Sequence, residues 1–173
     1  GDDRFNLSTN PDTTALWAIS SDFHESASLW ESSDHGQNWK RVDDGSFPEH
    51  TVRIVHDPNG GASYALAPGG LHVSRYQGKS WEKTALSEPL HGLVFVERSD
   101  PLDRALIVGT NTGVKVSVDE GISWQNMSKG LLSIPHTVTY ANGVLVATSD
   151  AGYFICNTVD CAGVSQPVAS PED

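Results

Sequence analysis

The sequence predicts an all-β protein built from four similar antiparallel sheets, each of four short strands, and three observations predict it. An eight-residue motif occurs three times, at 32–39, 74–81 and 117–124, so that its first serines are 42 and 43 residues apart. A turn with proline beside an acidic or amide residue precedes each copy, at 10–12, 57–59 and 99–101. No segment has a sustained helical period of apolar residues.

Each repeat of about 43 residues contains the same elements in the same order. An apolar or alternating run before the proline turn, such as 51–56 or 92–97, is the first strand. The apolar run after that turn is the second strand, at 15–19, 63–67 and 105–109. A polar or glycine-containing turn and a third strand lead into the motif, and the tryptophan of the motif opens the fourth strand. Short runs of this kind between turn residues are typical of strands. A four-stranded unit at this period is typical of a propeller blade, because one such sheet cannot bury both faces alone.

The fourth repeat supplies strands and turns but lacks the motif. Aligning Gly113 with Gly152 places Cys156 at the position of Ser117, and Cys161 on the far side of the same turn. We expect a disulfide between Cys156 and Cys161 to close this hairpin, with two reduced, buried thiols as the alternative. A short disulfide loop favours an extracytoplasmic location, which is secreted, periplasmic or luminal.

The repeats define one propeller domain, residues 1–168, and a tail at 169–173. Its blades are expected at about 1–46, 47–88, 89–131 and 132–168. Four blades either close as a small wheel or form part of a larger one, completed by further sequence or by a second copy in a homodimer.

The motif resembles the Asp-box, or BNR, repeat of sialidases, sortilin-type (Vps10-like) receptors, xyloglucan-cleaving glycosidases and photosystem II assembly factors. The resemblance covers all four repeats and is strongest in the first and third. It implies a hairpin between the third and fourth strands of each blade, in which aspartates accept backbone N–H bonds and glycines adopt positive φ. The tryptophans are expected to pack between blades. The residues concerned are Ser32, Asp34, Gly36 and Trp39, then Ser74, Gly78 and Trp81, then Ser117, Asp119, Gly121 and Trp124. Tyr76 replaces the aspartate in the second copy, so that turn lacks its acceptor. Because the motif residues serve the turn and the packing of the blades, we interpret all three motifs as structural.

Composition limits the partners. The formal net charge of −11 argues against nucleic-acid binding, which needs a basic face, and leaves cations or basic surfaces as ligands. No apolar run reaches the roughly 18 residues of a membrane span. We therefore expect a protein or glycan partner.

Histidines recur near the start of three first strands. His50, His91 and His136 each follow a proline closely, and the first repeat has Asp2 or Asp3 at the equivalent position before its first strand. Imidazole and carboxylate groups around one axis suit a divalent transition metal such as Zn²⁺ or Cu²⁺. The alternative is that each histidine hydrogen-bonds within its own strand entry or faces solvent.

The chain lacks the architecture of the enzymes that share the motif. A sialidase needs an arginine triad and six blades, and Arg53 is the one arginine suitably placed. A xyloglucan-type glycosidase needs two propeller domains with an acid pair between them. Loop carboxylates at Asp22, Glu25, Asp44, Glu49, Glu88 and Asp150 leave a glycoside hydrolase as the second hypothesis. The first is a non-catalytic binding or assembly module.

Overall fold

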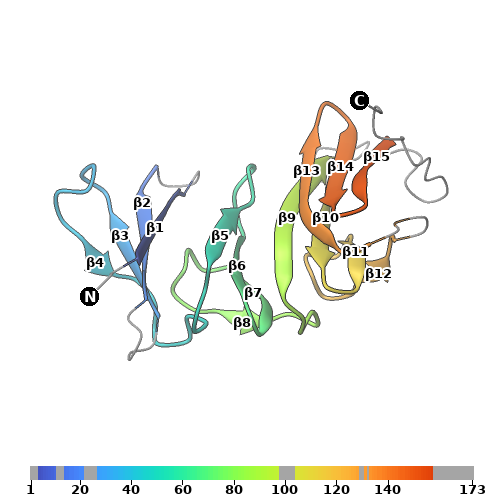
Figure 1. Ribbon diagram of the computed structural model, residues 1–173. Coiled ribbons are helices and arrows are strands. Elements are labelled where there is room, and N and C mark those ends of the chain that lie inside the picture. The colour runs from blue at the N-terminus through green and yellow to red at the C-terminus, as the bar shows by residue number, and fades with distance from the viewer. Residues whose placement is uncertain are drawn as a thin grey trace. The chain divides into compact units, whose positions relative to one another are not determined.

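The computed structural model describes residues 4–10, 14–21, 27–97, 104–128, 131 and 133–157. These residues form fifteen strands in four antiparallel sheets and contain no helix (Figure 1). Each sheet is a meander in which strands consecutive in sequence are neighbours, which is the strand order of a propeller blade. The chain divides into two compact units, Gly1–Ser87 and Glu88–Asp173, each of which contains two sheets.

The first unit contains blades 1 and 2. Blade 1 consists of β1 (Arg4–Thr9), β2 (Leu16–Ser21), β3 (Ser28–Ser32) and β4 (Lys40–Arg41). Blade 2 consists of β5 (Arg53–His56), β6 (Ser63–Ala67), β7 (Gly70–Ser74) and β8 (Glu82–Lys83). All five residues of β6 are buried because both faces of this inner strand are covered. The outermost strands β4 and β8 have two exposed residues each, so these sheet edges are short.

The second unit contains blades 3 and 4. Blade 3 consists of β9 (Leu90–Glu97), β10 (Arg104–Thr110), β11 (Gly113–Ser117) and β12 (Gln125–Asn126). Blade 4 consists of β13 (Pro135–Ala141), β14 (Val144–Ser149) and β15 (Gly152–Asn157). The prediction of a fourth strand in this blade falls on residues outside the described ones.

Apolar side chains from adjacent blades meet in each unit. Trp17 and Leu29 of blade 1 share a buried cluster with Ile54, Ala65 and Trp81 of blade 2. In the second unit, side chains of β10 and β11 share a cluster with side chains of β13 and β14: Ala105, Ile107 and Val114 with Val138, Leu145 and Ala147. Alternate residues of a strand point to opposite faces, so within each unit one face of the first blade packs on the opposite face of the second.

The link between blades 1 and 2 is held by a buried carboxylate. Asp43 accepts bonds from Arg41 Nε and Nη2 at 3.1 and 2.9 Å, and from the Leu29 backbone N–H at 2.9 Å. Burial opposes ionisation of Asp43, but these bonds outweigh it, and the pKa of the carboxyl lies below its ordinary value. The bidentate pair with Arg41 therefore ties the entry loop of blade 2 to β4, and the bond from Leu29 ties it to β3 of blade 1.

Candidate functional site

The motif of blade 1 forms a closed hydrogen-bonded turn between β3 and β4. The Ser32 hydroxyl donates to Asp34 Oδ1 at 2.7 Å and accepts the Gly36 N–H at 2.9 Å. The Asp34 carboxylate also accepts the backbone N–H and the side-chain amide of Asn38, at 2.9 and 2.7 Å. Gly36 has φ +87°, which favours glycine.

The motif of blade 3 repeats this geometry. Ser117 donates to Asp119 Oδ1 at 2.7 Å and accepts the Gly121 N–H at 2.8 Å. Asp119 accepts the backbone N–H and the hydroxyl of Ser123, at 2.9 and 2.5 Å. The lone pairs of both motif aspartates are therefore directed into their own turns.

These hydrogen bonds stabilise the ionised carboxylates. The pKa of Asp34 is lowered to about 2, first by the side chain of Asn38 and then by its backbone N–H and by Ser32. The pKa of Asp119 is lowered to about 2 by the corresponding bonds from Ser123 and Ser117. A carboxylate of such low basicity is poorly suited to exchange protons near neutral pH.

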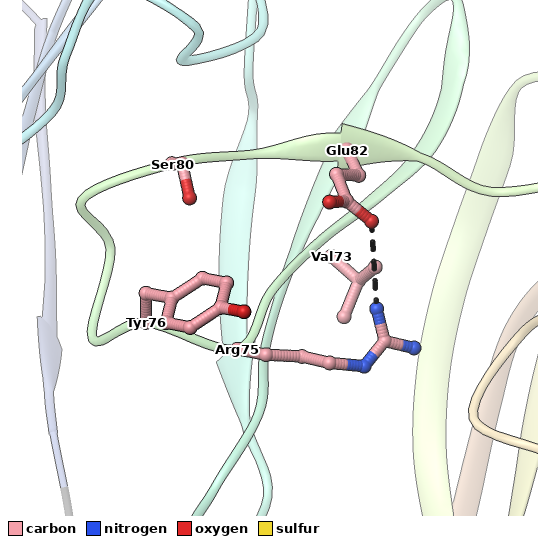
Figure 2. Close-up of a pocket in the computed structure, with 5 residues that line it drawn as sticks. All are labelled: Val73, Arg75, Tyr76, Ser80 and Glu82. Carbon is pink, nitrogen blue, oxygen red and sulfur yellow. Dashed lines mark ion pairs between the residues drawn. The ribbon is translucent and has the colours of Figure 1, made fainter.

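The motif of blade 2 differs because Tyr76 stands where the other copies have aspartate. Ser74 Oγ still accepts the Gly78 N–H at 3.0 Å, but no carboxylate occupies the centre of the turn. A hollow of about 170 Å³ lies beside this turn, lined by Tyr76, Arg75, Glu82, Ser80 and Val73. Figure 2 shows these five side chains. Arg75 and Glu82 approach to 3.8 Å across it, and this exposed pair contributes little stability.

Each motif tryptophan is anchored in the same way. The indole N–H of Trp39 donates to the Gly36 carbonyl at 3.1 Å, and that of Trp81 donates to the Gly78 carbonyl at 3.0 Å. Trp124 donates to the Gly121 carbonyl at 3.2 Å. The burial of these rings differs: Trp81 is 6% exposed and Trp39 is 37% exposed.

Two histidines occupy equivalent positions at the opposite end of blades 3 and 4. The β9–β10 register passes from Gly92↔Gly109 to Leu90↔Thr110, so His91 is the extra residue of a β-bulge. The β13–β14 register passes in the same way from Thr137 to Pro135, which makes His136 the extra residue there. Bulges redirect side chains, and both imidazoles are exposed.

Each of these imidazoles contacts the turn between the second and third strands of its own blade. His91 Nε2 lies 2.7 Å from Asn111 Oδ1, and His136 Nε2 lies 2.8 Å from Asp150 Oδ1. An imidazole that donates from Nε2 has its lone pair on Nδ1. A metal ion would therefore bind through Nδ1, or would have to displace Asn111 and Asp150.

His50 does not share this register. Arg53 pairs with Leu66 as Gly92 pairs with Gly109, so Val52 occupies the position of His91, and His50 lies two residues earlier with φ +55°. Within either unit, the described residues contain no group of three His, Cys, Asp or Glu side chains placed to hold a metal ion. Asp2 and Asp3 lie outside the described residues, and the metal site stays a prediction.

A carboxylate beside His91 is held by an ammonium group. Glu88, in the entry loop of blade 3, pairs with Lys115 Nζ and accepts the Thr112 hydroxyl at 2.8 Å. Burial opposes ionisation of Glu88, but the bonds from Lys115, Thr112 and Thr110 outweigh it and lower its pKa. The side chains of Glu88 and Lys115 are both largely buried.

The sequence singled out Glu88 and Asp150 as loop carboxylates, but it assigned no role to Asn111, Thr112 or Lys115. Nothing in the sequence showed which entry-loop residue the turn 110–112 would contact. Of the other loop carboxylates, Asp44 and Glu49 are exposed in the entry loop of blade 2, whereas Asp22 and Glu25 are outside the described residues.

Cys156 lies in β15 opposite Leu145, as Ser117 lies opposite Leu106, and it is buried. Cys161 is outside the described residues, so the disulfide stays a prediction. No helix among the described residues is long and apolar enough to cross a membrane.

A scan against protein-family models finds no match, and a search of curated proteins finds none. Solved structures do match. A GH74 enzyme of Niastella koreensis is similar with a TM-score of 0.68 and 16% identity, over 92% of this chain and 29% of that chain. YCF48 bound to a D1 peptide is similar with a TM-score of 0.64 and 15% identity, over 95% of this chain and 53% of that one. A chain of a nidogen/laminin complex has a TM-score of 0.61 and 15% identity, over 91% and 61%.

The fold is that of a β-propeller. The four sheets are its blades, and this chain spans between about a third and three fifths of the length of these three propeller chains. At this level of identity the likeness concerns the fold alone.

Proposed function

We propose that this protein is a non-catalytic, extracytoplasmic propeller of the Asp-box type that binds a segment of a partner protein. The binding surface is the end of the second unit at which β9 and β13 begin, named here the loop end: Glu88, His91, Asn111, Ile134, His136 and Asp150. The observation that carries the proposal is the pair of bulged histidines, each held by a neighbouring turn and exposed on adjacent blades.

The packing of blade 4 on blade 3 supports the placement of the loop-end side chains on one surface. β13 lies against β9, and a methyl group added at Gly92 or Gly109 would lie 3.3 or 3.2 Å from the Val138 side chain. Gly92 of β9 and Gly109 of β10 therefore permit the close approach of β13, which brings the starts of β9 and β13 to one end of the unit.

The chemistry of the loop end suits a peptide with an apolar and a basic side chain. Ile134 is exposed immediately before the buried Pro135, and the Asp150 carboxylate is exposed beside His136. Glu88 is neutralised by Lys115, so Asp150 carries the accessible negative charge. An apolar contact flanked by preordered polar groups is typical of a protein-binding surface. Two of the similar structures are complexes, of nidogen with laminin and of YCF48 with a D1 peptide.

Binding is tested by fluorescence anisotropy with a labelled peptide that carries leucine between two arginines, beside the same peptide with glutamates in place of the arginines. We expect the arginine peptide to bind, and binding to weaken at least tenfold in Asp150→Asn and in Ile134→Ser. Glu82→Gln, at the opposite end of blade 2, is the control and should bind as the wild type does. Equal binding of both peptides, or no binding, would contradict the proposal.

A glycoside hydrolase is the second candidate, and the similarity to the GH74 enzyme favours it. It requires a carboxylic acid pair that flanks a sugar ring. Turnover of a fluorogenic sialoside or β-glucoside by the wild type, abolished in Glu88→Gln, would favour the hydrolase over the binding module.

A further inference from the structure

The motif hairpin of blade 2 carries an aromatic ring where the other two motifs carry a carboxylate. Tyr76 stands at the position of Asp34 and Asp119, and it is 66% exposed. Its turn closes without the phenol side chain, because Ser74 Oγ accepts the Gly78 N–H at 3.0 Å. The ring is therefore not needed by the turn, and it is accessible to a ligand.

The hollow beside this ring brings a hydrogen-bond donor and an acceptor next to it. Val73 and Glu82 are cross-strand partners in β7 and β8, and Arg75 and Ser80 lie two residues beyond them on the hairpin. Arg75 Nη1 and Glu82 Oε2 are 3.8 Å apart. Figure 2 shows this pair on one side of the hollow, with Tyr76 and Ser80 on the other. The hollow thus combines an aromatic surface with a guanidinium, a carboxylate and a hydroxyl group.

The outer hairpin of a blade stays open to solvent when another blade packs on that blade. Alignment of the three motifs identifies the residues of blades 1 and 3 that correspond to Arg75, Ser80 and Glu82. Blade 2 packs on blade 1, and blade 4 packs on blade 3, each within one unit. All six corresponding residues are exposed in these packed blades: Ser33, Asn38 and Lys40 in blade 1, and Val118, Ser123 and Gln125 in blade 3. Packing between blades therefore buries their inner strands and leaves this part of the hairpin accessible.

We propose that the hollow of the blade 2 motif binds one ring of a neutral carbohydrate. A pyranose ring has a face of C–H bonds and an edge of hydroxyl groups, each of which can donate and accept. The negative face of the Tyr76 ring suits the C–H face of the sugar. The Glu82 carboxylate accepts from one hydroxyl group, and the Arg75 guanidinium donates to its neighbour.

The charge of the hollow favours a neutral sugar over an acidic one. Arg75 and Glu82 are the charged residues that line it, and their charges cancel. An anionic ligand would therefore gain no net attraction from the hollow, and the chain as a whole has a formal net charge of −11, which repels it.

Affinity electrophoresis tests the site with three probes: native gels that contain hydroxyethylcellulose, galactomannan or the acidic polygalacturonate. We expect at least one of the two neutral polysaccharides to retard the wild type. Tyr76→Ala and Glu82→Gln should each raise its dissociation constant about tenfold, because each removes one contact with the ring. Tyr76→Phe restores the aromatic surface and should recover most of the binding that Tyr76→Ala loses.

The controls separate a binding role from a structural one. Tyr76→Ala should leave the circular dichroism spectrum unchanged, because the turn does not use this side chain. Ile122→Ala, which removes a 69% exposed side chain from the blade 3 motif, should migrate as the wild type does. The gels contain no peptide, so their outcome leaves the peptide site at the loop end to its own assay.

Three results would overturn the carbohydrate site. The first is the absence of retardation in both neutral gels. The second is stronger retardation by polygalacturonate than by either neutral polymer, which would indicate recognition of an anion. The third is retardation by a neutral polymer that Tyr76→Ala leaves unchanged.

Discussion

The glycine of the blade 2 motif offers the sharpest test of how the blades pack. Gly78 has φ +77°, and a Cβ atom added there would lie 2.7 Å from both Trp17 Cη2 and Leu29 Cδ2. Both side chains are fully buried in blade 1, so neither moves freely. Gly36 is the matched control, because its φ is +87° but its added Cβ meets the nearest atoms at 3.7 and 3.9 Å.

The two substitutions share one energetic contribution and differ in a second. Holding alanine in the left-handed region costs about 1–2 kcal/mol, and loss of glycine flexibility in the unfolded chain offsets about 0.4–1 kcal/mol. We therefore expect Gly36→Ala to lower the free energy of unfolding by about 1 kcal/mol. Gly78→Ala also overpacks a filled cluster, which adds about 1–3 kcal/mol. Its total is about 2–4 kcal/mol.

Urea denaturation followed by circular dichroism measures both values. Both glycines lie in the same unit, which makes the comparison direct. Equal losses at the two positions would refute the reasoning, because backbone strain alone would then account for the effect and the motif would not pack on blade 1.

Three further predictions concern ionisation, thiols and metal. The pKa values of Asp34 and Asp119 fall from 3.8 to about 2 on folding, so the stabilisation by the two carboxylates is complete above about pH 4 and is lost as the pH falls toward 2. Between pH 4 and 2 the melting temperature of the wild type should therefore fall more steeply than that of the double variant Asp34→Asn/Asp119→Asn. Parallel curves would contradict this. Titration of the denatured, unreduced protein with a thiol reagent should detect no free thiol if Cys156 and Cys161 are bonded, and two thiols would exclude the bond. Calorimetric titration of chelator-treated protein should show Zn²⁺ or Cu²⁺ binding that weakens in His91→Ala. Identical titrations of wild type and variant would show that the histidine cluster does not bind the metal.

The blades themselves follow from local features of the sequence. Turn residues and short apolar runs repeat at a nearly constant spacing, and the strands formed where these patterns placed them. The position of Cys156 opposite Leu145 could also be predicted, because a strand of fixed length separates it from Gly152, as another separates Ser117 from Gly113. Such features depend on residues within one hairpin, so periodicity along the chain is sufficient to find them.

The equivalence of the histidines was decided by tertiary structure. Spacing from a proline suggested that His50, His91 and His136 were alike, but the register assigns the blade 2 position to Val52. A bulge inserts one residue without changing the apolar pattern of the strand, so sequence alone does not reveal it.

Contacts between elements distant in sequence were likewise decided only by folding. The sequence by itself determined four blades, their turns and the motif serines, aspartates and glycines. It did not determine that Lys115 would neutralise Glu88, or that Gly78 would rest on Trp17. The first outcome depends on where the entry loop of blade 3 lies against β11. The second depends on which face of blade 1 meets blade 2, and burial between two sheets is a property of the pair rather than of either strand.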